Sequence, residues 1–180
     1  MKYFVHLLSL FILSFSVISY GENNLPKSED IKYISLALSS PAFNNADSIP
    51  TQYTCDGQNV SPPLTITGVP KQAQSLMLIA VDRESSNQID QDIIWFMYNI
   101  PPQTKTIESN QTALFNGRNS SGFYTYTPPC PKEGLHHYYF ALYALNIALP
   151  ETVSSLQETS TLIKGHLIGY ANLMGTYARK

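Results

Sequence analysis

Residues 75–82 read SLMLIAVD, an apolar run that ends in an acidic residue. A continuous apolar run of this length is typical of a β-strand that is covered on both faces. Two further runs have the same character, IIWFMYNI at residues 93–100 and YYFALYAL at residues 138–145. Weaker strand signals lie at residues 33–38 and 166–177, and Pro, Gly and Asn residues separate the segments. The pattern predicts a mostly β fold.

One helix is predicted, within residues 151–164. Pro150 precedes this segment, Gly165 follows it, and its valine and leucine residues form a modest apolar face. The chain of 180 residues contains no repeat and no low-complexity tract. We therefore expect residues 31–180 to form a single domain.

The N-terminal segment has the pattern of a targeting signal. Lys2 precedes a short apolar run at residues 7–18, and small residues follow up to Gly21. This arrangement predicts a signal peptide over residues 1–21, whereas the alternative is a buried N-terminal helix. The polar residues 22–30 are predicted to form a flexible arm. We therefore expect a secreted or periplasmic protein whose membrane contact is at most peripheral, because the apolar run is too short to span a bilayer.

Composition excludes several classes of function. The chain has 11 Lys and Arg residues against 13 Asp and Glu residues, for a net charge of −2. Such a balance does not favour nucleic-acid binding, which needs a surplus of positive charge. Hydrophobic residues make up 43% of the chain, which excludes disorder as the dominant state. The motifs of nucleotide-binding loops, zinc proteases and hydrolase nucleophiles do not occur, so no cofactor is predicted.

Two cysteines, Cys55 and Cys130, occur in the chain. In an oxidising compartment an even pair favours a disulfide. Two other interpretations are a catalytic thiol and a zinc ligand. Zinc would need more ligands, and His136 and His137 lie near Cys130 without a CxxC or HxxxH pair to support them.

Two positions suggest a small polar site. Asp82 ends an apolar run, so it is either a carboxylate at the mouth of a buried sheet or an acid that begins a turn. His136 and Tyr138 share one face of a predicted strand, because alternate strand residues point the same way. Beside the proline-rich segment PPCP at residues 128–131 they could bind a small anion. The alternative is a pair of half-buried residues with no role in binding.

The chain resembles the phosphatidylethanolamine-binding protein family, specifically its bacterial Raf-kinase-inhibitor-like branch, from about Ile34 to Arg179. The order and spacing of several short pieces together carry the resemblance. They are Phe43, Ile49-Pro50, Tyr53-Thr54-Cys55-Asp56-Gly57, Asn59-Val60-Ser61-Pro62, Gly68-Val69-Pro70, Ser75-Leu76, Trp95, Tyr98-Asn99-Ile100-Pro101, Pro129-Cys130-Pro131, Gly134-Leu135-His136-His137-Tyr138 and Leu173-Met174-Gly175-Thr176-Tyr177.

The resemblance implies a β-sandwich with peripheral short helices and a small pocket that accepts phosphate-like anions. Carried over residue by residue, the ligand-binding positions are Asp82, His136, Tyr138 and the backbone around Pro129. The resemblance is also consistent with a bridge between Cys55 and Cys130.

Several pocket positions depart from the family pattern. Ile94 stands where the family has a histidine, so one of two pocket histidines is missing. Arg83 and Glu84 follow Asp82 where the family has Pro and Asp, and alternation directs Arg83 away from the side of Asp82. In addition, Pro128 replaces a glycine and His137 an arginine. A single histidine is mostly neutral at pH 7, so the resemblance with these departures implies a weakened anion pocket.

We therefore expect a secreted, non-enzymatic protein that binds a small anionic ligand. The alternative is a protein-interaction or inhibitor module, of the kinase- or protease-inhibitor kind, that would use the surface loops at residues 83–91 or 116–127 to bind a protein partner. A hydrolase that uses His136 and Asp82 is a third hypothesis, but no motif supplies its nucleophile.

Overall fold

The computed structural model describes residues 36–85, 93–111, 115–153 and 155–179. The predicted signal peptide (1–21), the predicted arm (22–30) and residues 33–35 of the first predicted strand lie outside these ranges. In chain order the elements are β1 (Ala37–Ser39), the 3₁₀-helix η1 (Thr51–Tyr53), β2 (Leu64–Thr67), β3 (Ser75–Asp82), β4 (Ile93–Ile100), β5 (Thr106–Ile107), β6 (His136–Leu145), α1 (Leu156–Leu162) and β7 (Leu167–Tyr177). No helix among these residues is long and apolar enough to cross a membrane.

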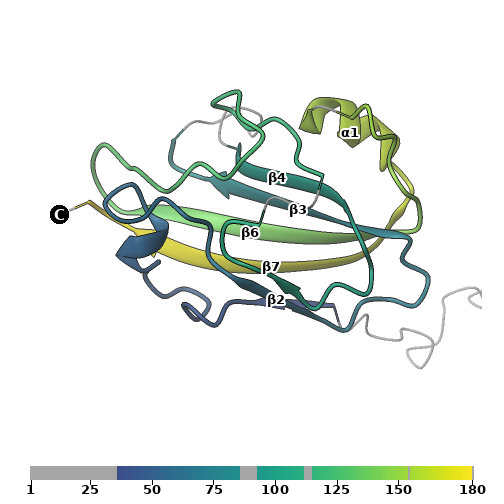
Figure 1. Ribbon diagram of the computed structural model, residues 1–180, viewed down its shortest axis with the longest axis horizontal. Coiled ribbons are helices and arrows are strands. Elements are labelled where there is room, and N and C mark those ends of the chain that lie inside the picture. The colour runs from purple at the N-terminus through teal and green to yellow at the C-terminus, as the bar shows by residue number, and fades with distance from the viewer. Residues whose placement is uncertain (1–35, 86–92, 112–114, 154, 180) are drawn as a thin grey trace, which may run out of the picture. The chain divides into compact units, whose positions relative to one another are not determined.

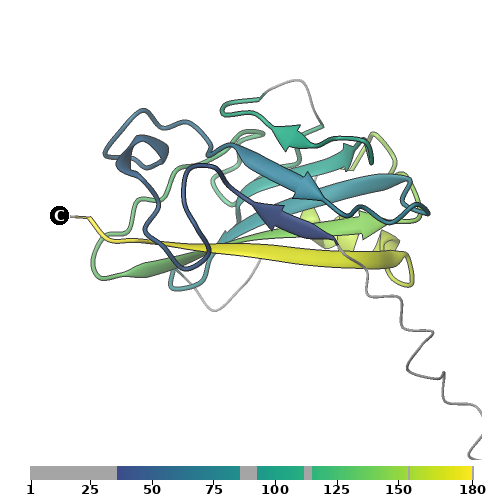
Figure 2. The same cartoon turned by 90° about the horizontal axis from the view of Figure 1, so that it is seen from below.

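The strands form two antiparallel sheets that pack face to face (Figures 1 and 2). The larger sheet has the order β4-β3-β6-β7, and the smaller sheet has the order β1-β2-β5. The side chains between the sheets form the main core, in which Trp95, Tyr138 and Phe140 are the largest fully buried residues. The fold is therefore a mostly β sandwich with few helices, as the sequence predicts.

The strongest apolar runs of the sequence form the two strands β3 and β4. In β3 only Val81 is partly exposed, because Leu76, Leu78 and Ala80 enter the main core while Met77 and Ile79 enter a second cluster on the outer face. Loop residues around α1 complete that second cluster. Both faces of these strands are covered, which confirms the interpretation of their continuous apolar pattern.

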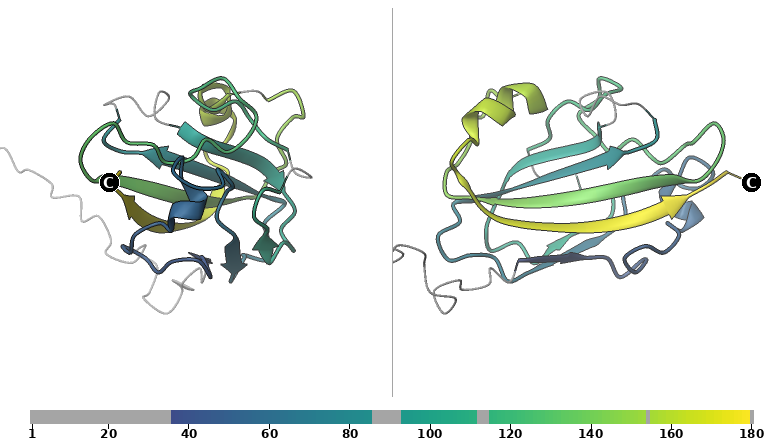
Figure 3. Two further views of the ribbon diagram at one scale, coloured as in Figure 1. Left: turned by 60° about the vertical axis from the view of Figure 1, so that its left-hand side comes forward. Right: turned by 180° about the vertical axis from the view of Figure 1, so that it is seen from behind.

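The third apolar run behaves differently, and the prediction that it is covered on both faces is wrong. Strand β6 begins at His136, and its burial alternates between buried and partly exposed residues along most of its length. Tyr138, Phe140 and Leu142 face the main core, whereas Tyr139 and Tyr143 are partly exposed on the outer face. The reason is that α1, with only seven residues, leaves part of this face open (Figure 3).

The helix and the last strand lie where the sequence places them. Ser155 caps α1 by accepting a hydrogen bond from the Glu158 backbone N–H over 3.3 Å. Strand β7 pairs with β6 along most of its length. The short elements β2, β5 and η1 were not predicted, because two to four residues are too few to show a period.

Candidate functional site

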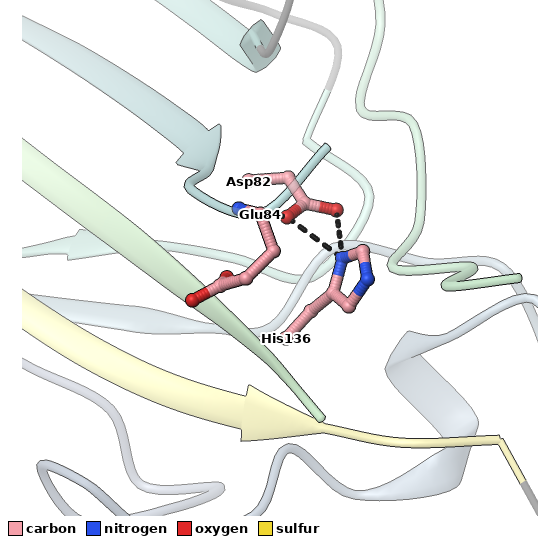
Figure 4. A group of neighbouring side chains, drawn as sticks. All are labelled: Asp82, Glu84 and His136. Carbon is pink, nitrogen blue, oxygen red and sulfur yellow. Dashed lines mark hydrogen bonds and ion pairs between the residues drawn. The ribbon is translucent and has the colours of Figure 1, made fainter. Parts of the chain in front are cut away.

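Asp82 and His136 meet where β3 ends and β6 begins. The register pairs Asp82 with Tyr138 across the two strands, which brings His136 to the same end of the sheet. The Nδ1 atom of His136 lies 2.9 Å from each carboxylate oxygen of Asp82 (Figure 4). Asp82 Oδ1 also accepts a hydrogen bond from the Glu84 N–H over 3.1 Å. Both interpretations of Asp82 are thus correct: it begins a turn, and it places a carboxylate at the mouth of the sheet.

The pairing with Asp82 determines the tautomer of His136. An ionised carboxylate can only accept hydrogen bonds, so Nδ1 of His136 must carry a hydrogen and donate it. The second ring nitrogen, Nε2, lies on the side of the ring away from Asp82 (Figure 4). In the neutral ring Nε2 can only accept a hydrogen bond, whereas in the protonated ring it donates one. Whether Nε2 carries a hydrogen therefore decides whether the ring offers a ligand a hydrogen-bond donor or an acceptor.

Tyr138 lies on the same face as His136, as alternation predicts. The two rings are stacked, with centroids 6.2 Å apart and an angle of 25° between their planes. The Tyr138 side chain is fully buried, and its hydroxyl lies outside hydrogen-bond geometry with every described residue, although the Asp82 carboxylate is close enough to act on it. Burial raises the pKa of Tyr138, and the nearby Asp82 carboxylate raises it further, so the hydroxyl stays protonated. A buried donor without a partner is uncommon in folded proteins.

Glu84 is a polar residue of the site that the sequence analysis named only as a departure from the family pattern, without a role in binding. Its carboxylate accepts hydrogen bonds from the His137 backbone N–H over 2.6 Å and from the His137 ring over 2.7 Å. Partial burial raises the pKa of Glu84, but the hydrogen bonds from His137 outweigh this effect, so its pKa lies below the usual range. This pair ties the loop after β3 to the first residues of β6.

Asp82, Glu84 and His136 offer donor atoms within 4.8 Å of one another, a set that a divalent cation could use. However, Nδ1 of His136 already donates to Asp82, and Glu84 already accepts two hydrogen bonds from His137. A cation would have to displace these contacts. The arrangement therefore resembles a histidine–carboxylate pair more closely than a metal centre.

A disulfide links Cys55 to Cys130, which confirms the predicted pairing and leaves neither sulfur free to act as a nucleophile or a zinc ligand. The Cys55 backbone N–H also donates to the Pro129 carbonyl over 3.1 Å. The turn after η1 and the proline-rich loop are thus joined twice. Because proline has no N–H, within residues 128–132 only Cys130 and Lys132 have backbone N–H groups to offer an anion.

These groups line a hollow of about 520 Å³, here termed the Asp82–His136 hollow. All four predicted ligand-binding residues border it: Asp82, Pro129, His136 and Tyr138. Ile94 also borders it and is 9% exposed, so the isoleucine forms part of the wall without closing the space. Sequence reasoning missed Lys132, Glu133 and the two hydroxyls of Ser120 and Ser121. The one available signal was Lys132, a cation directly after the proline-rich loop.

The fold and the site together define the structural class of this protein. It is a mostly β sandwich with a ligand-sized hollow at one end of the larger sheet. The family model described as phosphatidylethanolamine-binding protein matches residues 39–178. The chain belongs to this family.

Relatives and solved structures agree with this assignment. A UPF0098 protein of Methanothermobacter thermautotrophicus is 39% identical over 150 residues, which are 79% of this chain and 98% of the relative. A UPF0098 protein of Chlamydia trachomatis is 37% identical over 149 residues, which are 80% of this chain and 99% of the relative. The crystal structure of CT736, a phosphatidylethanolamine-binding protein homologue from Chlamydia trachomatis, is similar with a TM-score of 0.76 and 35% identity, covering 82% of this chain and 99% of that chain. YbcL of E. coli, 22% identical with a TM-score of 0.71 over 81% of this chain and 99% of its own, shares the fold.

Proposed function

We propose that this protein is a secreted, non-enzymatic member of the bacterial Raf-kinase-inhibitor-like branch, and that it binds a small phosphate-like anion in the Asp82–His136 hollow. The observation that carries the proposal is the buried Tyr138 hydroxyl, which makes no hydrogen bond with any described residue and stands beside the His136 ring. An anion oxygen would supply an acceptor in hydrogen-bond geometry, in competition with the nearby Asp82 carboxylate. Secretion is supported by the charged and apolar N-terminal pattern and by the disulfide, a bond favoured in oxidising compartments.

Each of the two carboxylates nearest the hollow has a histidine partner, but that partner offsets the negative charge only when the imidazole is protonated. Asp82 accepts from His136, and Glu84 accepts from His137. Lys132 adds one cation at the border. Glu133, the third acidic residue of the border, is exposed to solvent, where its repulsion of an anion is screened. Binding would therefore be weak in the neutral state of His136.

Protonation of His136 should strengthen binding. When the ring becomes an imidazolium, Nε2 changes from an acceptor to a charged donor, and the bond that it makes with an anion is a charge-assisted one. In this state Nδ1 still donates its hydrogen to Asp82, at 2.9 Å. The fraction of imidazolium rises as the pH falls, so affinity for an anion should rise in the same direction.

Calorimetric titration with phosphoethanolamine at pH 5.5 and pH 7.5 tests the proposal. We expect binding to be about tenfold tighter at the lower pH, because a charge-assisted hydrogen bond is worth about 1.5 kcal/mol or more. Sulfate serves as a second probe: phosphomonoesters change their own charge near pH 6, but sulfate does not. Equal sulfate affinity at the two pH values, or no binding of either anion, would contradict the proposal.

Two histidine variants test whether His136 causes the pH dependence of anion binding. In His136→Asn the amide keeps a donor toward Asp82 but lacks a group that can titrate, so we expect the affinity for sulfate to become independent of pH. His166→Asn is the matched control, because the His166 ring is bonded to Asn146 and does not border the hollow. It should retain the pH dependence of the natural chain.

Tyr138→Phe separates a binding role from a structural one. We expect phosphoethanolamine affinity to fall about tenfold, because the anion loses a buried donor. The free energy of unfolding, measured by urea denaturation, should stay constant or rise by about 1 kcal/mol, because the variant removes a buried hydroxyl that has no partner. The control is Tyr126→Phe, whose hydroxyl donates to the Tyr53 carbonyl over 3.0 Å. It should lose about 1 kcal/mol of stability and keep its affinity. The reverse pattern would refute the proposed role of Tyr138.

A second candidate function is the protein-interaction or inhibitor module. It is favoured by the exposure of large side chains in the loop at residues 116–127, where Phe123 is 62% exposed and Tyr124 is 52% exposed. Residues 86–91 of the other predicted loop lie outside the described part of the chain. A partner that the natural chain captures from the extracytoplasmic fraction, and that Phe123→Ser/Tyr124→Ser fails to capture, would favour this function.

A further inference from the structure

A second cavity lies on the opposite face of the larger sheet. Because neighbouring strand residues point to opposite faces, Asp82 and Tyr138 face the Asp82–His136 hollow, whereas Arg83 and Tyr139 face the other side. A groove of about 700 Å³, here termed the outer groove, lies there between the sheet and residues of α1. Figure 3 shows the position of α1 relative to the larger sheet. The position of the outer groove confirms that Arg83 points away from Asp82.

The register of the strands determines the floor of the outer groove. Ile79 of β3 pairs with Ala141 of β6, and Ala141 pairs with Asn172 of β7. Two residues further along β6, Tyr143 pairs with Tyr170, and the centroids of their rings lie 5.2 Å apart. The floor is therefore mostly apolar and aromatic. A volume of 700 Å³ lies within the range of cavities that hold small molecules.

The charge of the outer groove is concentrated at one end. Arg83 is the single charged residue among the described residues that line it. Its guanidinium lies 5.9 Å from the centre of the Tyr139 ring, and it forms no ion pair with a described carboxylate. A cation held over an aromatic ring at the end of an apolar channel is complementary to a ligand with one anionic end and an apolar body.

We propose that the outer groove binds a single-chain amphiphile with an anionic head, of the long-chain carboxylate class. The carboxylate would pair with Arg83, and the alkyl chain would lie along the floor between Ile79, Ala141 and Tyr143, against α1. Exposed apolar side chains beside the groove support this occupant: Leu167 is 48% exposed and Tyr170 is 55% exposed, and an alkyl chain would cover part of both.

A second copy of the chain fits the outer groove less well. A two-fold dimer places equivalent surfaces against each other, so a concave groove would face a concave groove and leave the space between them empty. A two-fold axis that runs along the groove would also bring the two Arg83 side chains toward each other. A neutral apolar ligand would leave the guanidinium without a partner.

Calorimetric titration with octanoate, decanoate and dodecanoate, each below its aggregation concentration, tests the proposal. Affinity should rise by up to about fourfold for each added methylene, the fold-change equivalent to burying one methylene group. Decyltrimethylammonium, a cationic amphiphile of similar chain length, should bind at least about tenfold more weakly than decanoate. No binding of dodecanoate, or equal binding of the two head groups, would overturn the proposal.

Two surface variants locate the ligand. Arg83→Gln should weaken dodecanoate binding about tenfold while the dependence on chain length remains. Ser160→Trp, on the exposed side of α1 that borders the groove, should weaken all chain lengths by filling the space. Both residues are exposed, so neither change should prevent folding.

The anion proposal and this one can fail independently. His136→Asn should leave dodecanoate affinity unchanged, and phosphoethanolamine should not displace dodecanoate. If His136→Asn abolishes dodecanoate binding, the carboxylate occupies the Asp82–His136 hollow and the outer-groove proposal is wrong. Sedimentation of the ligand-free chain provides one more test: a dimer that Ser160→Trp dissociates would show that a second copy covers the groove and would also overturn it.

Discussion

Replacement of both half-cystines, in the variant Cys55→Ser/Cys130→Ser, lowers the free energy of unfolding by about 4 kcal/mol, which corresponds to a fall of about 10 °C in melting temperature. The bridge connects residues that are 75 positions apart, so its loss frees a long loop in the unfolded chain. Urea denaturation of the natural and variant chains at neutral pH measures the difference. The natural chain with its bridge reduced should lose the same amount.

The same variant also tests the link between the disulfide and the Asp82–His136 hollow. Cys130 borders this hollow together with Pro128, Pro129 and Pro131, and the bridge anchors their loop to the turn after η1. We expect phosphoethanolamine affinity to fall in the double variant at temperatures where it is still folded.

If the free energy of unfolding of the double variant stays within about 1 kcal/mol of the natural value, the bridge does not restrain the unfolded chain as argued.

Gly57→Ala is expected to destabilise the protein by about 3 kcal/mol or more. A Cβ atom at this position would lie 2.2 Å from the Thr51 carbonyl oxygen and 2.6 Å from the Gln52 Cα. Both are backbone atoms of η1, so a rotamer change cannot relieve the overlap. The turn would have to open, and the hydrogen bond from the Gly57 N–H to the Thr54 carbonyl over 3.1 Å would be disturbed.

Gly134→Ala is the matched control for this substitution. Gly134 has a φ of +76°, and a Cβ there would meet no atom within 4 Å. The expected penalty is about 1 kcal/mol, from the left-handed backbone alone. Urea denaturation of the two variants compares the stability lost through a steric clash with the stability lost through a left-handed backbone conformation. An equal loss of stability in both would contradict the steric explanation for Gly57.

Strands β3 and β4 and the helix α1 were predictable because their residue patterns are local. Strands β3 and β4 carry continuous apolar runs, and α1 lies between Pro150 and Gly165. The third run, at residues 138–145, shows the limit of this reasoning. Its composition resembles that of β3, but its outer face is half open, because burial depends on what a short helix covers and not on the strand alone.

The candidate site was predictable in part for the same reason. Alternation within a strand placed His136 and Tyr138 on one face, and the family resemblance added Asp82 and Pro129. Glu84 was not identified, because its partner His137 lies 53 positions away and the contact depends on the register between β3 and β6. The outer groove was missed for a related reason, since its floor combines residues from three strands.

The sequence by itself determined the β class, the main strands and the late helix, because hydrophobic periodicity acts over short distances. It favoured a disulfide between the two cysteines, because each has one possible partner, and the structure confirmed that bond. Tertiary structure alone decided that Asp82 holds the His136 ring, that the Tyr138 hydroxyl is buried without a hydrogen-bond partner among the described residues, and that Arg83 stands over Tyr139 on the other face. These features depend on strand register, and a shift of one residue would turn every side chain to the opposite face of the sheet.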